Sequence, residues 1–116
     1  MSYRVVKAHA PEPGPESDEV LAVAEGTRLR WQRKPTKWSG WLYCEDIAGV
    51  HGWVPEAWLK LEGTEAMIDW DYDATELCVD VGAVLEAELI ESGWLLASDG
   101  GGRRGWVPLG CLQVLT

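Results

Sequence analysis

The chain has 116 residues, and its shares of 47% hydrophobic and 25% charged residues are typical of a globular protein, which excludes a disordered chain. Its net charge of −9 is uneven: residues 1–62 carry eight Lys or Arg against nine Asp or Glu, whereas residues 63–116 carry two against ten. An acidic second half repels phosphate, so neither nucleic acid nor a membrane surface is expected as a partner.

The N-terminal residues 1–10 contain no apolar run that resembles a signal peptide, and no segment approaches the roughly 18 apolar residues of a membrane span. The three cysteines, Cys44, Cys78 and Cys111, form no Cys-x-x-Cys pair and are odd in number, which argues against a disulfide framework or a zinc site. Free thiols are typical of a reducing compartment, so we expect a cytoplasmic protein in which Cys44 and Cys111 are buried.

Two copies of one pattern follow each other along the chain. Residues 40–42 (Gly-Trp-Leu) and 52–55 (Gly-Trp-Val-Pro) return 53 residues later, at 93–95 and 105–108. Four upstream positions return at an offset of 56: Leu21, Val23, Gly26 and Leu29 match Leu77, Val79, Gly82 and Leu85. The change of offset places three extra residues in the loop before Gly40. Coincidences of these residue types in one register indicate an internal repeat.

The second copy has the two-residue period of β-strands. Residues 68–74 alternate apolar side chains with Asp69, Asp71 and Asp73, which predicts a strand with one acidic face. Pro108 ends a later strand because it lacks a ladder donor. Further strands are predicted at residues 79–82, 84–90, 94–97, 105–107 and 112–115, with a glycine-rich turn at 98–102.

Five short strands with glycine turns favour a small barrel, so the repeat predicts an all-β protein of two five-stranded barrels in tandem. The first barrel is expected at residues 1–61 and the second at residues 66–116. Residues 62–65 (Glu-Gly-Thr-Glu) are expected to form a short linker between them. Such small domains bury a modest fraction of their surface, which suits an aromatic set of eight Trp, three Tyr and no Phe.

The order of these motifs resembles the Src homology 3 domain. Residues 71–74 (Asp-Tyr-Asp-Ala) resemble the opening A-L-Y-D-Y segment of that family, with Trp70 at its first tyrosine. Residues 76–82 resemble the E-L-S-F-x-x-G-D segment, residues 93–97 the G-W-W-x-A segment, and residues 105–112 the G-Y-I-P-S-N-Y-V segment. The resemblance covers nearly the whole chain, and the tandem arrangement is similar to short bacterial two-barrel proteins, which are ligand-binding variants of the family.

The resemblance implies a groove of aromatic side chains that binds a peptide, stacking a polyproline II ligand on flat rings. The loop residues Asp73 and Glu76 would meet a cationic group of the ligand. Two departures from the family are expected to matter: Cys111 replaces the last groove tyrosine, and Ala8 and Ala10 stand at the paired tyrosines of the first copy. The implied ligand-binding residues are Trp41, Trp53, Pro55 and Trp58 in the first copy, and Trp70, Tyr72, Asp73, Glu76, Trp94, Trp106 and Pro108 in the second.

Other chemistries have less support in the sequence. The two histidines, His9 and His51, lie in unrelated segments with no Ser, Cys or Asp motif beside them, so no catalytic residue is expected. Residues 69–80 resemble an EF-hand calcium loop, but Ala74 replaces its glycine, and neither a metal nor another cofactor is expected. The Arg- and Lys-rich segment 28–37 is read as a solvated face or a dock for an acidic neighbour, rather than a nucleic-acid patch.

The sequence therefore predicts a monomeric, non-enzymatic module that recognises a peptide or protein segment, proline-rich or basic, through aromatic grooves. Two alternatives from other classes stay open. One is a structural or scaffold subunit that packs permanently on a partner, and the other is an unrecognised enzyme or metal-binding protein. Obligate dimerisation would favour the first of these, and a bound metal the second.

Overall fold

The computed structural model of the protein describes residues 1–10, 20–36 and 38–115. The regular structure of these residues is β-sheet except for two three-residue 3₁₀ turns, η1 (Glu56–Trp58) and η2 (Leu109–Cys111). The expectation of an all-β protein is therefore confirmed. Among the described residues, no helix has the length and apolar character that a membrane span requires.

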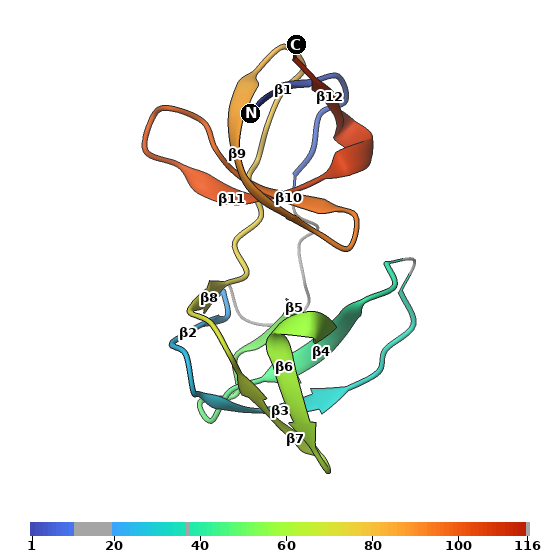
Figure 1. The fold of residues 1–116 in the computed structure, drawn as a ribbon, viewed down its shortest axis with the longest axis vertical. Helices are drawn as coiled ribbons and strands as arrows, with labels where there is room; N and C mark the ends of the chain where they lie inside the picture. Colours follow the sequence, from blue (N-terminus) through green and yellow to red (C-terminus); the bar gives the residue numbers. More distant parts are fainter. Residues whose placement is uncertain (11–19, 37, 116) are drawn as a thin grey trace. The chain divides into compact units, whose positions relative to one another are not determined.

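The chain divides into two compact units that are not the two halves of its sequence (Figure 1). Of the described residues, 1–10 and 75–115 form unit 1, and 20–74 form unit 2. Unit 1 is therefore discontinuous in sequence, with unit 2 inserted between its parts. This division differs from the expected barrels at 1–61 and 66–116, because the first strand of each sequence copy lies in the unit that the other copy forms.

Unit 1 contains a five-stranded antiparallel sheet in the order β11-β10-β9-β1-β12. The N-terminal strand lies inside this sheet, where Tyr3 pairs with Leu85 on one side and with Val114 on the other. Next to the sheet, His9 and Val79 form a bridge with two backbone hydrogen bonds of 3.0 and 2.9 Å. The strands are β1 (Ser2–Val5), β9 (Val84–Glu91), β10 (Trp94–Ser98), β11 (Arg104–Pro108) and β12 (Leu112–Val114).

Unit 2 repeats this strand order as β5-β4-β3-β7-β6 and adds the short pair β2-β8. Strand β7 occupies the place that β1 has in unit 1, since Ala66 pairs with Leu29 on one side and with Leu61 on the other. The strands are β2 (Ala22–Val23), β3 (Arg28–Gln32), β4 (Trp41–Glu45), β5 (His51–Pro55), β6 (Leu59–Glu62), β7 (Glu65–Ile68) and β8 (Tyr72–Asp73).

Residues 62–65 form the turn of a β-hairpin, which corrects the expected linker. Glu62 ends β6 and pairs with Glu65 at the start of β7, and Gly63 between them has a φ of +63°. A glycine with positive φ at the first of two loop residues is favoured in such hairpins, because its twist matches that of the strands. The Nε1–H of Trp31 lies 3.1 Å from the carbonyl oxygens of both Gly63 and Glu65. The hairpin thus holds β7 beside β6 and places it in unit 2.

The strand registers confirm the internal repeat. Trp41 pairs with Pro55 as Trp94 pairs with Pro108, so the two Gly-Trp motifs stand in the same register. The extra residues also lie in the connection where the change of offset predicts them: residues 33–40 join β3 to β4, whereas residues 92–93 join β9, which is three residues longer than β3, to β10.

Closed barrels are not seen in the described part of the chain. Both sheets are open, with β11 and β12 as the edges of one and β5 and β6 as the edges of the other. The chain passes from one edge to the other through η2 or η1, directly after Pro108 or Pro55. A proline has no N–H for a ladder hydrogen bond, so pairing ends at these two positions.

The strand that is expected over residues 68–74 is interrupted. Strand β7 ends at Ile68, the chain bends at Asp69 and Trp70, and β8 begins at Tyr72. Ile68 and Tyr72 are buried, but Trp70 is 61% exposed because the bend breaks the two-residue period. Residues 79–82 are likewise not a strand, and only Val79 among them forms a β-bridge.

Each unit has an apolar core that includes one exchanged strand. Val5 of β1 and Ile68 of β7 are both fully buried. Burying a side chain of this size stabilises a fold by about 1.5–3 kcal/mol, so each exchanged strand contributes to the unit in which it lies. The core of unit 1 consists of Val5, Leu77, Val79, Leu85, Leu95, Ala97, Val107 and Cys111.

The cysteines confirm the expectation that Cys44 and Cys111 are buried. All three cysteines carry free thiols, and Cys78 is exposed. Burial raises the pKa of the Cys44 thiol to about 12, because a thiolate is poorly solvated in an apolar interior. Cys44 therefore stays protonated at neutral pH and serves as a small apolar core residue.

Candidate functional site

The exchange of β1 and β7 regroups the candidate ligand-binding residues. Trp70, Tyr72 and Asp73 were expected beside the Trp residues of the second copy, but they follow β7 and lie in unit 2. Unit 2 therefore holds Trp41, Trp53, Pro55, Trp58, Trp70, Tyr72 and Asp73, and unit 1 holds Glu76, Trp94, Trp106 and Pro108.

Tyr72 of unit 2 contacts the Trp58 ring and the Trp53 backbone, and Trp41 lies on the strand next to that of Trp53. The Tyr72 hydroxyl donates a hydrogen bond of 2.5 Å to the carbonyl oxygen of Trp53. The Trp58 ring packs edge to face on the Tyr72 ring, with centroids 5.4 Å apart. Trp41 stands across from Pro55 on the neighbouring strand. Tyr72 and Trp41 are buried, whereas Trp53 and Trp58 are half-buried, so the cluster has both a supporting side and an accessible side.

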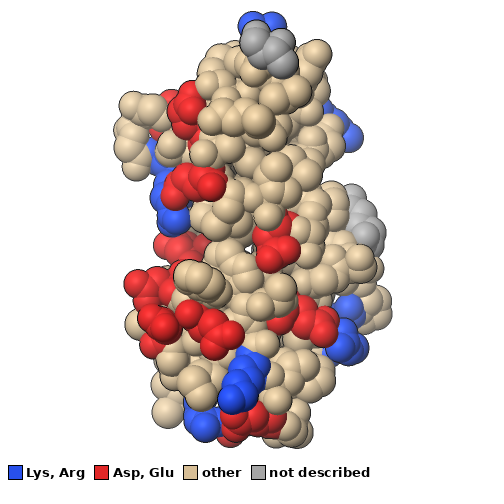
Figure 2. Space-filling view, in the orientation of Figure 1, with Lys and Arg blue, Asp and Glu red and all other residues tan. Residues whose placement is uncertain are grey.

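Acidic residues lie close to the exposed Trp70 in the sequence. Asp69, Asp71 and Asp73 are all exposed, and one Asp71 oxygen accepts a hydrogen bond of 2.8 Å from the backbone N–H of Glu25. Figure 2 shows acidic side chains gathered over the part of unit 2 that contains β2 and β8. A surface of one charge sign attracts groups of the opposite sign, so this edge of unit 2 favours a cation.

Unit 1 has a different set at the equivalent positions. His9 forms a bridge with Val79, and Tyr72 pairs with Val23, which is the equivalent of Val79 in the repeat. His9 is therefore the equivalent of Tyr72, whereas Ala8 and Ala10 were expected there. The His9 Nε2 atom lies 2.9 Å from a Glu76 oxygen. The His9 ring also packs edge to face on Trp94, with centroids 5.6 Å apart.

Two further positions of unit 1 belong to its interior. Cys111, which replaces Trp58 at the offset of 53, lies in the apolar core. Trp106 is only 2% exposed, and its backbone pairs with the segment 75–77 through two hydrogen bonds of 3.0 Å. Unit 1 therefore carries fewer aromatic side chains at the positions where unit 2 has its cluster.

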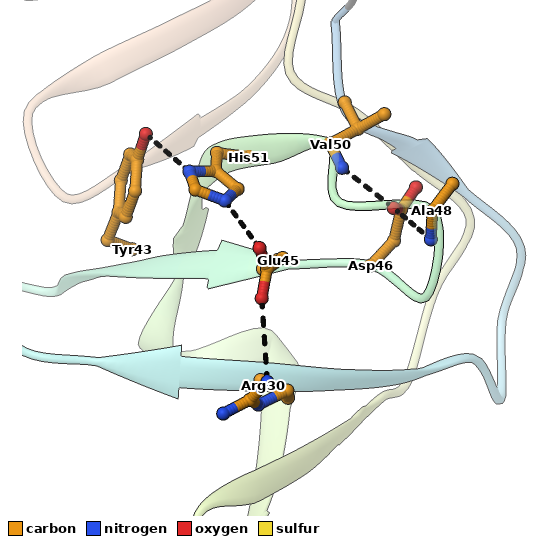
Figure 3. A network of polar contacts seen from close by, with 7 residues as sticks. All are labelled: Arg30, Tyr43, Glu45, Asp46, Ala48, Val50 and His51. Atoms are coloured by element: carbon orange, nitrogen blue, oxygen red, sulfur yellow. Dashed lines mark hydrogen bonds and ion pairs between the residues drawn. The ribbon is translucent and has the colours of Figure 1, made fainter. Parts of the chain in front are cut away.

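A polar network that the sequence does not reveal joins side chains of β3, β4 and β5 in unit 2 (Figure 3). The His51 Nε2 atom lies 2.6 Å from one Glu45 oxygen, and its Nδ1 atom lies 3.2 Å from the Tyr43 hydroxyl. Arg30 approaches the other Glu45 oxygen at 3.9 Å. The imidazole is thereby fixed between a carboxylate and a hydroxyl.

Both histidines thus have a glutamate partner. The sequence shows no Ser, Cys or Asp motif beside either of them. The sequence does not reveal these pairs. Glu45 and His51 face each other on two neighbouring strands, and His9 and Glu76 are separated in the sequence by the whole of unit 2. Within the described residues, no group of three or more His, Cys, Asp or Glu side chains is arranged to hold a metal ion.

The basic segment around β3 is paired with carboxylates. Arg28 lies 3.4 Å from a Glu62 oxygen, and Arg33 lies 3.2 Å from a Glu56 oxygen. Exposed ion pairs of this kind contribute at most about 1 kcal/mol each, but they lower the positive potential of the segment.

The acidic second half of the sequence does not become an acidic unit. Among the described residues, unit 1 carries four Lys or Arg against six Asp or Glu, and unit 2 carries five against nine. The balances are −2 and −4, because Glu65, Asp69, Asp71 and Asp73 lie in unit 2.

Comparison of the chain with protein-family models, curated proteins and solved structures finds no match. The family resemblance of the motifs therefore rests on the residues themselves. The function has to be argued from the arrangement of side chains within each unit.

Proposed function

We propose that this protein is a non-enzymatic module of two Src-homology-3-like units that binds a peptide, and that unit 2 carries the binding surface. The observation that supports the proposal is the convergence of aromatic residues from both sequence copies in unit 2. Trp41, Trp53 and Trp58 come from the first copy, and Trp70 and Tyr72 follow the exchanged strand of the second.

The chemistry of this surface suits an extended, proline-rich segment. A polyproline II peptide is already ordered before it binds, so it loses little conformational entropy on flat rings. Trp and Tyr supply large contact areas with few rotatable bonds, and they dominate the energy of many interfaces. The exposed carboxylates of Asp69, Asp71 and Asp73 beside Trp70 add a preference for a basic residue in the ligand.

Unit 1 is proposed to have a supporting role. Its equivalent of Trp58 is the core residue Cys111, and its equivalent of Tyr72 is His9, which already pairs with Glu76. The free thiols are consistent with a reducing compartment, so we also propose a cytoplasmic location for a monomeric protein.

The test is a screen of the purified full-length protein against a peptide library, followed by two matched variants. Trp58→Ala removes an aromatic ring of unit 2, and Cys111→Ala changes the equivalent position of unit 1. We expect Trp58→Ala to weaken binding of the selected peptides about tenfold or more, as for a hot-spot residue. Cys111→Ala should leave the affinity unchanged.

Amide chemical shifts in both variants separate loss of binding from loss of folding. If Trp58→Ala does not fold, Trp58→Phe takes its place in the test. This variant keeps a ring at the site and is expected to retain part of the affinity. Peptides that bind all three variants equally, or that perturb only the amides of unit 1, would contradict the proposal.

A further inference from the structure

One lysine of unit 2 contacts an aromatic ring instead of a carboxylate. The Lys34 ammonium nitrogen lies 3.8 Å from the centroid of the Tyr43 ring. Within the described residues, Lys34 has no carboxylate at ion-pair distance, whereas its neighbours Arg30 and Arg33 each have one. The electron-rich face of an aromatic ring attracts a cation, so this contact identifies a surface that accepts an ammonium group.

The surroundings of Tyr43 suit such a group. Trp53 and His51 pack edge to face on the Tyr43 ring, with centroids 5.1 and 5.3 Å away. The half-buried Glu45 lies beside His51 on the neighbouring strand and adds a carboxylate, whose other oxygen lies 3.9 Å from Arg30; Figure 3 shows Tyr43, Glu45, His51 and Arg30. Tyr43, Trp53, Glu45 and His51 are here called the ammonium face.

Unit 1 shows that the ammonium face is not a requirement of the fold. The registers of β10 and β11 place Leu96, Ser98 and Arg104 where unit 2 has Tyr43, Glu45 and His51. In unit 1, Ser98 thus replaces the carboxylate of Glu45, and the cationic Arg104 replaces His51. Lys34 also has no equivalent there, because it lies in the longer segment between β3 and β4.

We propose that the ammonium face is a binding site for a lysine side chain of a peptide ligand, and that Lys34 occupies the site in the free protein. The incoming ammonium group displaces Lys34, so the self-contact lowers the apparent affinity for the ligand. The inference rests on the proposed function, because that function supplies the peptide that carries the lysine. Its site shares Trp53 with the proposed peptide-binding surface but includes neither Trp58 nor Tyr72.

The probe is Nα-acetyl-lysine methylamide, with the uncharged norleucine analogue as its control, titrated into the full-length protein and followed by amide shifts of β4 and β5. Lys34→Met removes the competing charge and keeps the length of the side chain. We expect it to bind the lysine probe about fivefold more tightly than the wild type. Lys60→Met, on exposed β6, changes the net charge equally and should bind like the wild type.

The double variant Lys34→Met/Tyr43→Leu gives unit 2 the leucine that unit 1 has at this position, and it should lose the binding. The proposal is overturned if Lys34→Met binds no more tightly than Lys60→Met, if the norleucine analogue binds as well as the lysine probe, or if no variant binds the probe. Library peptides that bind while the lysine probe does not would overturn this inference alone. Probe binding without any library peptide would overturn the proposed function alone.

Discussion

Unit 1 and unit 2 have the same strand order, and their registers agree except for a shift between β9 and β10, yet one face of β10 and β11 differs in character from the equivalent face of β4 and β5. Unit 2 presents Tyr43 and the Glu45–His51 pair, where unit 1 has Leu96, Ser98 and Arg104. The buried positions of the two units, in contrast, are filled by similar apolar side chains. The same strand order is therefore compatible with different side chains on this face, which leaves the face free to acquire a separate role.

The two units also differ in connectivity. All of the strands of unit 2 lie in one continuous segment, whereas β1 of unit 1 is separated from β9 by the whole of unit 2. Closing a longer loop costs more chain entropy, although the cost grows slowly with length. We therefore expect the folding of unit 1 to depend on unit 2 more than the folding of unit 2 depends on unit 1.

Separating the units is expected to give the largest effect. A fragment of residues 14–74 contains every strand of unit 2 and should fold alone. A fragment of residues 66–116 lacks β1, which lies between β9 and β12 and supplies the buried Val5, so it should remain unfolded. The dispersion of amide proton signals in NMR spectra distinguishes the two outcomes. A folded 66–116 fragment would contradict the strand exchange.

A smaller effect is expected at the glycine of each Gly-Trp-Val-Pro motif. A Cβ atom at Gly105 would lie 2.9 Å from the backbone N of Leu77 and the backbone O of Thr75, whereas at Gly52 it would meet the Leu21 side chain at 2.8 Å. Overpacking should cost Gly105→Ala and Gly52→Ala about 2 kcal/mol of unfolding free energy each, because neither the backbone atoms at Gly105 nor the Leu21 Cβ at Gly52 can move away by a rotamer change.

Urea denaturation of both variants measures this loss, with Gly110→Ala as the control. A Cβ atom at Gly110 has no neighbour within 4 Å, so that variant should stay within about 0.5 kcal/mol of the wild type. Equal losses in Gly105→Ala and Gly110→Ala would show that the close approach has no energetic consequence.

The smallest effect concerns the turn between β10 and β11. The backbone N–H of Gly101 donates to an Asp99 oxygen at 2.7 Å, and this bond, with help from Arg103, lowers the pKa of Asp99 below its ordinary value of 3.8. A lowered pKa means that the stabilising interaction is present above the ordinary value and is lost as the pH falls through the native pKa.

The Tm of the wild type should fall between pH 7 and a pH below the ordinary pKa of an aspartate, and Asp99→Asn should make this fall smaller. The change should be small, because the site is exposed to solvent. Thermal unfolding of the wild type and the variant at both pH values measures it. An identical fall in Tm for the two proteins would contradict the role of Asp99.

Much of the candidate site could be recognised in the sequence, but its grouping could not. The offset of 53 identifies Trp41, Trp53 and Pro55 together with their counterparts in unit 1, and the strand registers confirm it. The assignment of Tyr72 to unit 2, and the place of His9 in unit 1, depend on which sheet accepts β7 and which accepts β1. An alignment of two consecutive copies cannot contain that information.

One local signal could have revealed the exchange. Residues 59–68 read as two short runs separated by Gly63 and Thr64, and two loop residues with glycine first are typical of a hairpin. The repeat places a domain boundary at the same position, and the expected linker at residues 62–65 follows from that boundary. The correct reading requires β6 and β7 to belong to one sheet.

The sequence by itself determined β9 to β12 and the glycine-rich turn before β11, because the alternation of side chains and the conformational freedom of glycine act over a few neighbouring residues. Only the tertiary structure decided where β1 and β7 insert, because both are short strands that can enter either sheet by backbone pairing alone. The choice is made by the hairpin at Gly63 and by packing: Ala66 of β7 is fully buried, whereas its equivalent Tyr3 is larger and half-buried. A tyrosine in the place of Ala66 would overpack the core of unit 2, so side-chain volume selects the partner that backbone hydrogen bonds leave open.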